Sequence, residues 1–362
     1  MSLLFSPVRI GQHEARNRVW LAPMCQYSCE AQDGMPTEWH HEHLASFARG
    51  GVGVAMTEAA AVSPEGRISP WDAGIWSDEQ AEAWAPIAAR IAAHGALPAI
   101  QLAHAGRKGS TYREWSGQGS VPVAEGGWEA VGATDAAFGP YAPPRALTTE
   151  EVEQVVADFA AAAKRAWDAG FVVLEVHAAH GYLIHQFLSP LVNDRDDIWG
   201  ERTLLLRRTV EAVRAAAPEA GIVVRFSAHD WVAGGIDETM TAEHARVALA
   251  AGADWLDISS GGLDPRQQIQ VGPGYQVPLA ASVREATGAP VAAVGMLDDA
   301  ELAEATLAEG SADAIMIARG LLRNPHWALL AEAELDGAPE GSAWPVQYTR
   351  ARPRPVSVAA GR

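Results

Sequence analysis

Short apolar runs alternate with Ala-rich stretches of helical period about eight times along the chain. The runs hold β-branched and apolar residues without polar alternation, which is typical of strands buried on both faces of a parallel sheet. We therefore predict strands at residues 18–22, 54–60, 97–102, 172–176, 222–227, 255–259, 291–294 and 314–317. A helix is predicted after each strand, at residues 40–49, 78–93, 148–169, 203–216, 242–251, 278–287, 299–309 and 329–335.

Strands that are joined by helices pair in parallel, since a tight turn connects only antiparallel neighbours. A closed (β/α)8 barrel, the TIM barrel, fits this order best, and a doubly wound open sheet is the second choice. No predicted strand is followed by Gly-x-Gly-x-x-Gly or by a P-loop signature, which argues against a Rossmann dinucleotide domain. Because α/β barrels with insertions reach 362 residues, we expect residues 1–362 to form a single domain.

Two segments fall outside this alternation. Residues 105–147 are rich in Gly, Pro and Trp and have no helical period. Loops of this length are uncommon unless they are functional or form a subdomain, so we expect a capping subdomain here, a lid-like hairpin over the upper rim of the barrel. Residues 345–362 are rich in Pro and Arg and are either disordered or an arm toward a partner subunit.

The composition is that of a globular protein, with 48% hydrophobic and 20% charged residues. The net charge of −18 argues against nucleic acid or an anionic membrane as a partner. Cys25 and Cys29 are too few for a disulfide framework or a zinc cluster. Residues 1–10 lack the layout of a signal peptide, and no apolar run approaches the ~20 residues that span a membrane. A soluble cytoplasmic protein is therefore expected.

Chemically active side chains cluster where the fourth predicted strand ends. His177, His180 and Tyr182 form the pattern His-x-x-His-x-Tyr, and the active sites of (β/α)8 barrels lie at this end of the strands. A phenol can donate a proton, and two neutral imidazoles can donate hydrogen bonds to one oxygen. The trio therefore suits the polarisation of a carbonyl and the protonation of a neighbouring carbon. Zinc needs a third protein ligand that no Cys pair supplies, and ordinary buried polar residues are the remaining alternative.

Two late loops have the features of a phosphate site. Gly295 follows the seventh predicted strand and Arg319 follows the eighth, and these two loops form the recurrent phosphate site of the barrel. Gly295 lets backbone N–H groups approach the oxygens, and Arg319 adds a bidentate donor. Gly261 and Gly262, after the sixth strand, would widen this cradle. Alternatively, Gly295 only turns the chain and Arg319 pairs with a surface carboxylate.

Other strand ends carry groups that suit a flavin ring. The segment 23–25, with Pro23, Met24 and Cys25, follows the first strand, and Gln101 closes the third. Arg225 lies inside the fifth strand, where a charge in an apolar run needs a partner. A guanidinium there can stabilise negative charge on the N1/O2 edge of a reduced isoalloxazine, and an amide can read a pyrimidine-like edge. Gln101 can equally be a satisfied core amide, and Arg225 part of an internal salt bridge.

Taken together, these residues resemble the Old Yellow Enzyme family of FMN-dependent ene-reductases over about residues 4–350. Pro23-Met24-Cys25-Gln26-Tyr27 is most similar to the subgroup called thermophilic-like. In that subgroup the Cys tunes the flavin potential and the Tyr lines the substrate pocket, which assigns these roles to Cys25 and Tyr27. The resemblance implies FMN as cofactor and NADPH or NADH as reductant.

The resemblance also implies roles for the remaining residues. His177 and His180 would bind the carbonyl or nitro oxygen of an activated alkene, and Tyr182 would be the proton donor. The resemblance also places Ala59 and Gln101 on the flavin ring and Arg225 at the N1/O2 edge of that ring. Gly295 and Arg319 would lie at the phosphate of the cofactor.

The segment 345–350 resembles a C-terminal segment that sends an arginine, here Arg350, into the pocket of the neighbouring subunit. A homodimer or a dimer of dimers is therefore expected. One stretch departs from the family: after residues 195–200 the usual Gly-Ser-x-Glu-Asn-Arg is missing and Glu201-Arg202 follow directly, about four residues short. This gap removes a helix cap and shortens a loop near the upper rim.

The expected function is the reduction of the C=C bond of α,β-unsaturated ketones and aldehydes, maleimides and nitroalkenes, by hydride from flavin N5 and a proton from Tyr182. The first alternative is a flavin-free barrel lyase or isomerase that acts on a phosphorylated substrate. A Schiff-base lysine at a strand end would favour it, but no predicted strand ends in Lys, and Lys108 lies in a loop. The second alternative is a non-catalytic flavin-binding protein, which turnover of cyclohexenone would exclude.

Overall fold

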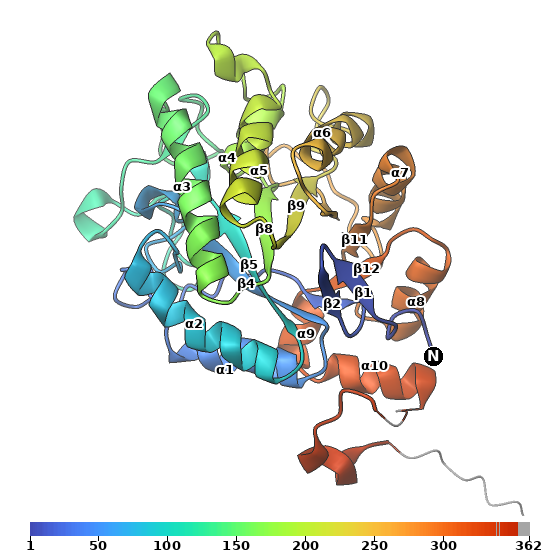
Figure 1. The fold of residues 1–362 in the computed structure, drawn as a ribbon. Coiled ribbons are helices and arrows are strands. Elements are labelled where there is room, and N and C mark those ends of the chain that lie inside the picture. Colours follow the sequence, from blue (N-terminus) through green and yellow to red (C-terminus); the bar gives the residue numbers. More distant parts are fainter. Residues whose placement is uncertain (338, 340, 354–362) are drawn as a thin grey trace, which may run out of the picture.

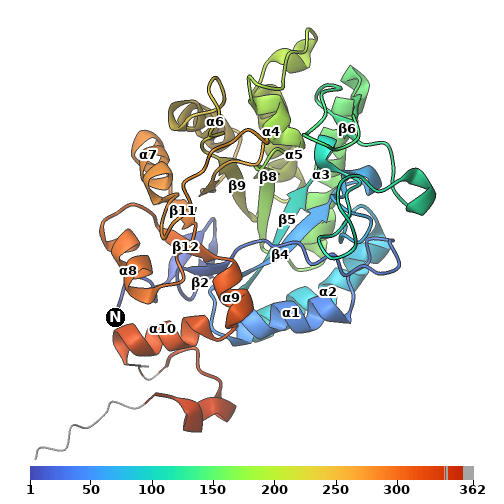
Figure 2. The ribbon, with the colours of Figure 1, turned by 180° about the vertical axis from the view of Figure 1, so that it is seen from behind.

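Eight parallel strands close into a barrel in the computed structural model, which describes residues 1–337, 339 and 341–353 (Figure 1). The order around the barrel is β3-β4-β5-β8-β9-β10-β11-β12, and β12 pairs back onto β3. Helices surround the barrel on the outside, as the view from behind also shows (Figure 2). The predicted (β/α)8 barrel is confirmed, and the pairing of the last strand with the first excludes an open sheet.

The observed elements begin and end within four residues of the predicted ones. The barrel strands are β3 (Val19–Leu21), β4 (Val54–Ala61), β5 (Leu97–Ala103), β8 (Val173–Ala178), β9 (Gly221–Ser227), β10 (Trp255–Ser259), β11 (Val291–Val294) and β12 (Ala314–Ile317). The helices that follow them are α1 (Glu38–Arg49), α2 (Asp78–Ala93), α3 (Thr149–Asp168), α5 (Leu204–Ala216), α6 (Glu238–Ala250), α7 (Val277–Thr287), α8 (Ala300–Ala308) and α10 (Trp327–Asp336).

Several short elements were not predicted. An antiparallel hairpin of β1 (Val8–Ile10) and β2 (His13–Ala15) packs Ile10 and Ala15 with the side chains inside the barrel. The helices α4 (Leu183–Leu188) and α9 (Arg319–Arg323) follow β8 and β12. Each of these pieces is too short to show a complete period of hydrophobic residues, so pattern reasoning could not find them.

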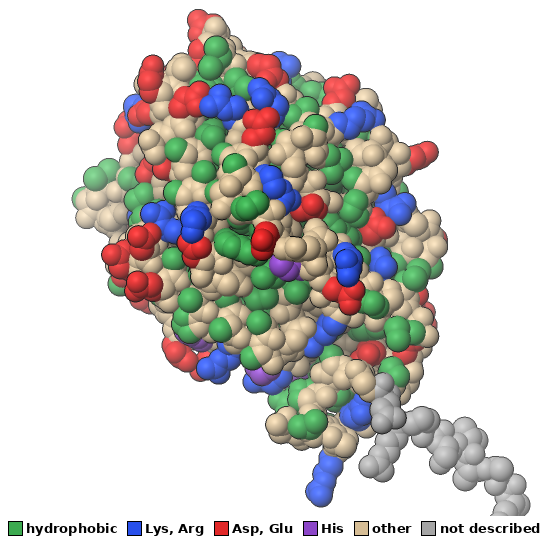
Figure 3. Space-filling view, in the orientation of Figure 1, with side chains coloured by type: hydrophobic (Ala, Val, Ile, Leu, Met, Phe, Trp, Pro, Cys, Tyr) green, Lys and Arg blue, Asp and Glu red, His purple; other side chains and the backbone are tan. Residues whose placement is uncertain are grey.

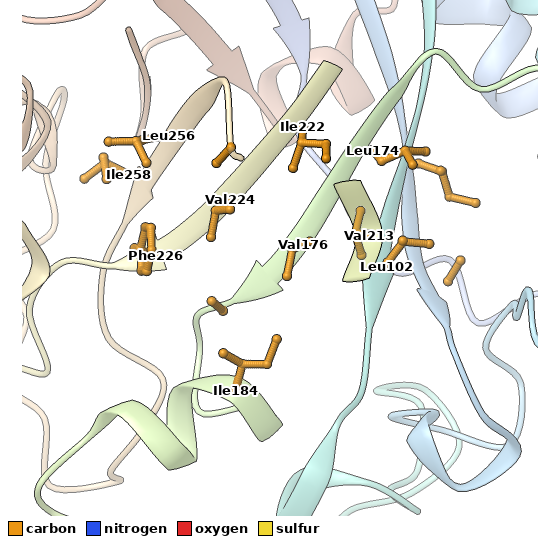
Figure 4. Packing of buried hydrophobic residues seen from close by; sticks show 14 of the residues in the cluster. Leu102, Leu174, Val176, Ile184, Val213, Ile222, Val224, Phe226, Leu256 and Ile258 are labelled. Carbon is orange, nitrogen blue, oxygen red and sulfur yellow. The ribbon is translucent and has the colours of Figure 1, made fainter. Parts of the chain in front are cut away.

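Two layers of apolar side chains stabilise the barrel. One lies inside it and includes Trp20, Met56 and Val173. The other lies between strands and helices and includes Val176 of β8, Val224 of β9 and Val213 of α5, which Figure 4 labels. Because side chains alternate along a strand, the residues next to these outward positions face the barrel interior.

The segment 105–147 lies against the C-terminal rim of the barrel. Its 3₁₀ helix η2 (Gly106–Lys108) bonds to the loop after β10, where Arg107 donates to the carbonyl of Leu263 and Lys108 to that of Gly262. An antiparallel bridge joins Thr111 to Ser120, whereas β6 (Val131–Gly132) and β7 (Arg145–Ala146) pair in parallel, so the segment is not one continuous hairpin. Another 3₁₀ helix, η3 (Val123–Glu125), also lies in this segment.

The segment 345–353 lies beyond α10 on the outside of the barrel (Figure 1). It contains the 3₁₀ helix η5 (Val346–Ala351), in which Arg350 is exposed. The remaining residues of the expected arm, 354–362, lie outside the described residues.

The shortened loop leads directly from the 3₁₀ helix η4 (Ile198–Gly200) into α5. Thr203 precedes α5 without a side-chain capping bond, so the expected loss of a helix cap is confirmed. Two hydrogen bonds involve the residues just before α5. The Glu201 carboxylate accepts the N–H of Thr203 at 3.0 Å, and the buried Trp199 indole donates to the carbonyl of Thr149 at 3.2 Å.

None of the described helices is both long and apolar enough to cross a membrane. Positive and negative side chains are interspersed on the face shown in Figure 3. On that face, the negative net charge is therefore not gathered into one acidic patch.

Candidate active site

Polar side chains occupy the upper inward positions of neighbouring strands. In β8, Val173 faces the barrel interior and Leu174 the helices, so Glu175 and His177 also point inward. Arg225 of β9 is in register with His177, and Asp257 of β10 is in register with Arg225. The interior therefore changes from apolar at the lower end to charged and polar at the C-terminal end, where barrel active sites lie.

The turn after β8 brings His177, His180 and Tyr182 together. The His177 ring centroid lies 5.2 Å from that of His180 and 5.0 Å from that of Tyr182, in both cases edge to face. His180 has a φ of 58°, in the left-handed region that side chains rarely adopt, and Gly181 continues with 75°. This local bend lets side chains three and five positions apart meet, and strain of this kind is common at functional sites.

Burial determines the protonation states of this trio. Nδ1 of His177 accepts the N–H of Ala179 at 3.2 Å, so the ring proton lies on Nε2. Burial, reinforced by Arg225, lowers the pKa of His177 and of His180 well below the ordinary value, so both rings are neutral at pH 7. Burial also raises the pKa of Tyr182 well above its ordinary value. The turn thus holds two neutral imidazoles and one protonated phenol.

Ser259 at the end of β10 decides which nitrogen of His180 carries the proton. The Ser259 hydroxyl lies 2.8 Å from Nε2 of His180 and 3.4 Å from Oε1 of Gln276. That amide oxygen already accepts a shorter bond, 2.7 Å, from Ser260. We therefore assign the Ser259 proton to the bond with His180, which leaves the His180 proton on Nδ1.

A buried hydrogen-bonded pair, His185 and Asp230, supports the turn from below. The N–H of Gly181 donates to Nδ1 of His185 at 2.9 Å, and the Gln186 amide donates to the carbonyl of Gly181 at 2.8 Å. Nε2 of His185 lies 2.9 Å from Oδ1 of Asp230, and both side chains are at most 1% exposed. Burial raises the pKa of Asp230, but hydrogen bonds from His185 and other donors outweigh burial and lower it overall.

Two buried polar pairs line the barrel interior beside the trio. Nε2 of Gln101 donates to Oε1 of Glu175 at 2.7 Å, and Nε of Arg225 lies 2.8 Å from Oδ2 of Asp257. The internal salt bridge considered for Arg225 is therefore present. Burial raises the pKa of both Glu175 and Asp257. No hydrogen bond joins the terminal nitrogens of Arg225 or Oε1 of Gln101 to another described residue, so these atoms are free to bind a ligand.

A further buried pair, Glu58 and His40, fixes the loop after β3. Glu58 of β4 accepts the N–H of Gln26 at 2.9 Å and lies 2.9 Å from Nε2 of His40. Nδ1 of His40 in turn accepts the N–H of Thr37 at 2.8 Å, so the imidazole proton points to the carboxylate. The segment 23–27 is thereby anchored at the same rim as the trio.

Cys25 and Tyr27 extend from this anchored segment toward β4 and the trio. Cys25 and Tyr182 both pack on a small apolar cluster that includes Ala59 of β4. Burial raises the pKa of the Cys25 thiol well above its ordinary value, which keeps the sulfur protonated. Tyr27 has a φ of 50°, and its ring meets that of Trp115 edge to face at 5.9 Å.

A cavity of about 310 Å³ opens at the C-terminal ends of β11 and β12. Gly295, with a φ of 129°, and Arg319 line it together with Ser259 and Gln276. No hydrogen bond or ion pair joins Arg319 to another described residue, so the alternative of a carboxylate partner does not hold. Gly261 and Gly262 do not line this cavity: Gly262 lies against His180, where a Cβ would meet the His180 Cα at 2.6 Å.

Some residues of this site were not singled out from the sequence. Glu175 and Asp257 are charges inside apolar runs, the same signal that identified Arg225. Ser259 could not be identified in this way, because its contact with His180 depends on how two loops meet. In the described part of the chain, no three His, Cys, Asp or Glu side chains are grouped to hold a metal ion.

Comparison with known proteins gives a consistent result. The sequence profile of the NADH:flavin oxidoreductase / NADH oxidase family matches residues 3–337. An NADPH dehydrogenase of Listeria monocytogenes serotype 4a (strain HCC23) is 41% identical over 355 residues, which cover 97% of this chain and 99% of the relative. The solved structure of an old yellow enzyme homologue from Zymomonas mobilis has a TM-score of 0.76 at 28% identity, covering 96% of this chain and 98% of that one. Morphinone reductase has a TM-score of 0.76 at 26% identity, covering 93% and 90%.

Proposed function

The chain belongs to the NADH:flavin oxidoreductase / NADH oxidase family, that of the Old Yellow Enzymes, and from this premise we propose that it is an NADPH-dependent ene-reductase with FMN as cofactor. The proposed reaction is the reduction of the C=C bond of enones, enals, maleimides and nitroalkenes. NADPH, named for the Listeria relative, is the proposed reductant, with NADH as the alternative. Membership of a flavin family argues against the flavin-free lyase or isomerase.

The residues of the site fit this cofactor. Arg319 has no partner among the described residues and lines the cavity together with Gly295. A Cβ at position 295 would come within 3.0 Å of side-chain atoms of Gln276 and Tyr275. These two residues would hold the phosphate. The free amide oxygen of Gln101 and the terminal nitrogens of Arg225 would face the ring and its N1/O2 edge. Cys25 and Ala59, with Pro23 and Met24 before them, would lie along the ring.

When bound, FMN would accept a hydride from NADPH and transfer it to the β-carbon of the alkene. The chain's own part begins with His177 and His180. The Nε2–H of His177 and the Nδ1–H of His180 would bind the carbonyl or nitro oxygen. Because both rings are neutral and held by backbone and Ser259, they would stabilise the negative charge that develops on that oxygen, without reorganisation.

Tyr182 would complete the reaction. Its O–H bond would break, and the proton would form the new C–H bond at the α-carbon, on the face opposite the added hydride. The raised pKa of Tyr182 keeps this proton in place until a carbanion-like centre develops. Tyr27 would line the pocket in which the alkene lies.

The observation that carries the proposal is the meeting of two neutral imidazoles and a protonated phenol beside unpaired atoms of Gln101 and Arg225. The test begins with the purified protein, which should be yellow, release FMN on denaturation, and lose its visible absorption when NADPH is added anaerobically. A colourless protein that takes up no FMN would contradict the proposal.

We also propose that the protein is a cytoplasmic homodimer or dimer of dimers in which Arg350 enters the neighbouring pocket. Support comes from the exposure of Arg350 in η5, outside the barrel. Light scattering should give a multiple of 38.4 kDa, and Arg350→Ala should raise the KM for the alkene. A monomer, or an unchanged KM, would refute this arrangement.

A further inference from the structure

Lys108 is a half-buried lysine at the edge of the proposed active site. It lies in η2, directly after β5, and its Nζ donates to the carbonyls of His180 at 2.8 Å and Gly262 at 3.0 Å. The same nitrogen lies 5.1 Å from the ring centroid of Tyr182 and 4.5 Å from that of Phe138. Two carbonyls and two aromatic faces therefore surround one ammonium group.

The composition of the chain makes this lysine unusual. Of the 27 Lys and Arg residues, only Lys108 and Lys164 are lysines. Lys164 is exposed on α3, where it pairs with Asp168. Arg107, next to Lys108, carries the larger guanidinium and donates to the carbonyls of Leu263 and Ala136 instead. A compact ammonium fits between His180 and Tyr182, whereas a guanidinium is larger and planar.

We propose that Lys108 is a positioning residue for the proton transfer: its ammonium holds the backbone of His180 and stabilises the phenolate that Tyr182 becomes when it gives up its proton. This inference rests on the proposed function. In this role Lys108 contacts neither substrate nor cofactor. It acts only through its neighbours His180 and Tyr182.

The first part of this role is mechanical. His180 has a strained φ of 58°, and Gly262 has a φ of 91° where the two chain segments touch. Lys108 bonds to both carbonyls and so joins the loops after β5, β8 and β10 at one point. Without the ammonium, two half-buried carbonyls lose their donor, and the His180 backbone is free to relax.

The second part is electrostatic. When Tyr182 donates, its O–H bond breaks, the proton goes to the α-carbon, and the electron pair stays on the phenolate until solvent supplies a new proton. Part of that negative charge spreads into the ring, so a cation over the ring is attracted more strongly after the transfer than before it. Such an interaction lowers the barrier because it grows along the reaction. Lys108 itself keeps its protons throughout.

The ammonium exists only over part of the pH range. Burial and the neighbouring Arg107 lower the pKa of Lys108 to about 8, so the charge is present at neutral pH and is lost as the pH rises through about 8. The groups that face Lys108 or its contacts from the surrounding elements are Arg107, His177, His180, Tyr182, Tyr141, Cys25, Asp72, Arg225 and Asp264. The pKa values of the two imidazoles and Asp264 are lowered and those of Tyr182 and Cys25 are raised, so these five do not titrate near pH 8. Burial raises the pKa of Asp72 to about 8, so the rate must be compared with the titration of Lys108 itself, measured by NMR.

The first test compares two acceptors in the FMN-loaded enzyme. Cyclohexenone requires protonation at carbon, whereas ferricyanide takes electrons without it. Lys108→Met should lower turnover with cyclohexenone by on the order of 10- to 100-fold more than turnover with ferricyanide. Lys108→Arg, which keeps the charge, should recover part of the loss, and Lys164→Met is the matched control. An equal fall with both acceptors, or no fall with cyclohexenone, overturns the inference.

The second test needs no substitution and so does not depend on a variant that folds. With only two lysines, protein labelled with ¹³C-lysine gives two side-chain signals, of which Lys164 is the internal reference. The turnover number with cyclohexenone should fall as the pH rises through the pKa measured for Lys108, while that with ferricyanide should not follow this titration. A rate that stays flat across the Lys108 titration refutes the inference. If the wild-type enzyme reduces ferricyanide but no alkene at any pH, it is the proposed function that fails.

Discussion

His180 depends on Ser259 for the position of its proton. The hydroxyl lies 2.8 Å from Nε2, and this bond leaves the proton on Nδ1, where a substrate oxygen could accept it. Residues that hydrogen-bond to the second nitrogen of a functional imidazole often change the affinity or activity that depends on the imidazole by about 10- to 100-fold. The role of the His180 ring therefore depends on Ser259, a residue of a different strand, β10.

Ser259→Ala should accordingly lower the rate of alkene reduction by about tenfold, because His180 would exchange between tautomers. ¹⁵N chemical shifts of the His180 ring should change from one tautomer to a mixture. Ser311→Ala, which removes a hydroxyl from the turn after α8, serves as the control. An unchanged His180 tautomer in the variant would contradict the assignment of the Ser259 proton.

Individual site residues differ in how far the sequence predicts them. His177, His180 and Tyr182 were identified because polar groups end an apolar run, and the structure brings the ring centroids of His180 and Tyr182 within 5.2 Å of that of His177. Glu175 and Asp257 give the same signal and could have been included. The contacts of Lys108 with His180 and Gly262 could not be foreseen, since they join residues far apart in the sequence through backbone carbonyls.

At the scale of elements, β8, its turn and α4 act as one unit. The buried pair of His185 and Asp230 supports Gly181, and hence the turn that carries His180 and Tyr182. Breaking a buried pair by removing one partner leaves the other without compensation. Since folding lowers the pKa of Asp230, the carboxylate contributes its full stabilisation at neutral pH and loses it as the pH falls through that lowered value.

Asp230→Asn should therefore reduce the free energy of unfolding by about 2–4 kcal/mol at pH 7, measured by urea denaturation. The difference from the wild type should shrink as the pH falls below about 4, the ordinary pKa of an aspartate, and on through the lowered pKa of Asp230. Asp196→Asn, an exposed acid in the loop after α4, is the matched control. A loss no larger than that of Asp196→Asn would mean that the pair does not support the turn.

The longer elements followed from periodicity alone. The barrel strands and their helices lie within four residues of the predicted ranges, because buried parallel strands and amphipathic helices of this length leave a clear pattern. The segment 105–147 was recognised as an insertion, but its parallel pair of β6 and β7 was not, since two-residue strands have no period. The hairpin of β1 and β2 escaped notice for the same reason.

At the scale of the whole molecule, the closed barrel places strand ends from distant parts of the chain at one rim. Loops after β3, β5, β8, β10, β11 and β12 all contribute to the proposed site. A ligand that contacts so many loops binds the folded chain and not the unfolded one, so it should stabilise the fold.

Removal of FMN should lower the Tm, and Arg319→Ala should weaken FMN binding on the order of 10- to 100-fold by removal of a charged phosphate donor. Fluorescence titration of the flavin-free protein measures the affinity directly. Arg207→Ala, which removes an exposed guanidinium paired with Glu211 on α5, should leave the affinity unchanged. Equal affinities for the Arg319 and Arg207 variants would exclude Arg319 from the phosphate site.

The central claim is that the turn after β8 polarises and protonates an alkene, and anaerobic reoxidation of the reduced enzyme by cyclohexenone tests it most directly. After reduction by NADPH, the wild type and Tyr112→Phe, which alters an exposed phenol bound to Glu125, should recover the visible absorption at the same rate. Tyr182→Phe should recover it about 10²- to 10⁴-fold more slowly, as expected for the loss of a general acid. Recovery of Tyr182→Phe at the wild-type rate, or a wild type that cyclohexenone does not reoxidise, would contradict the account.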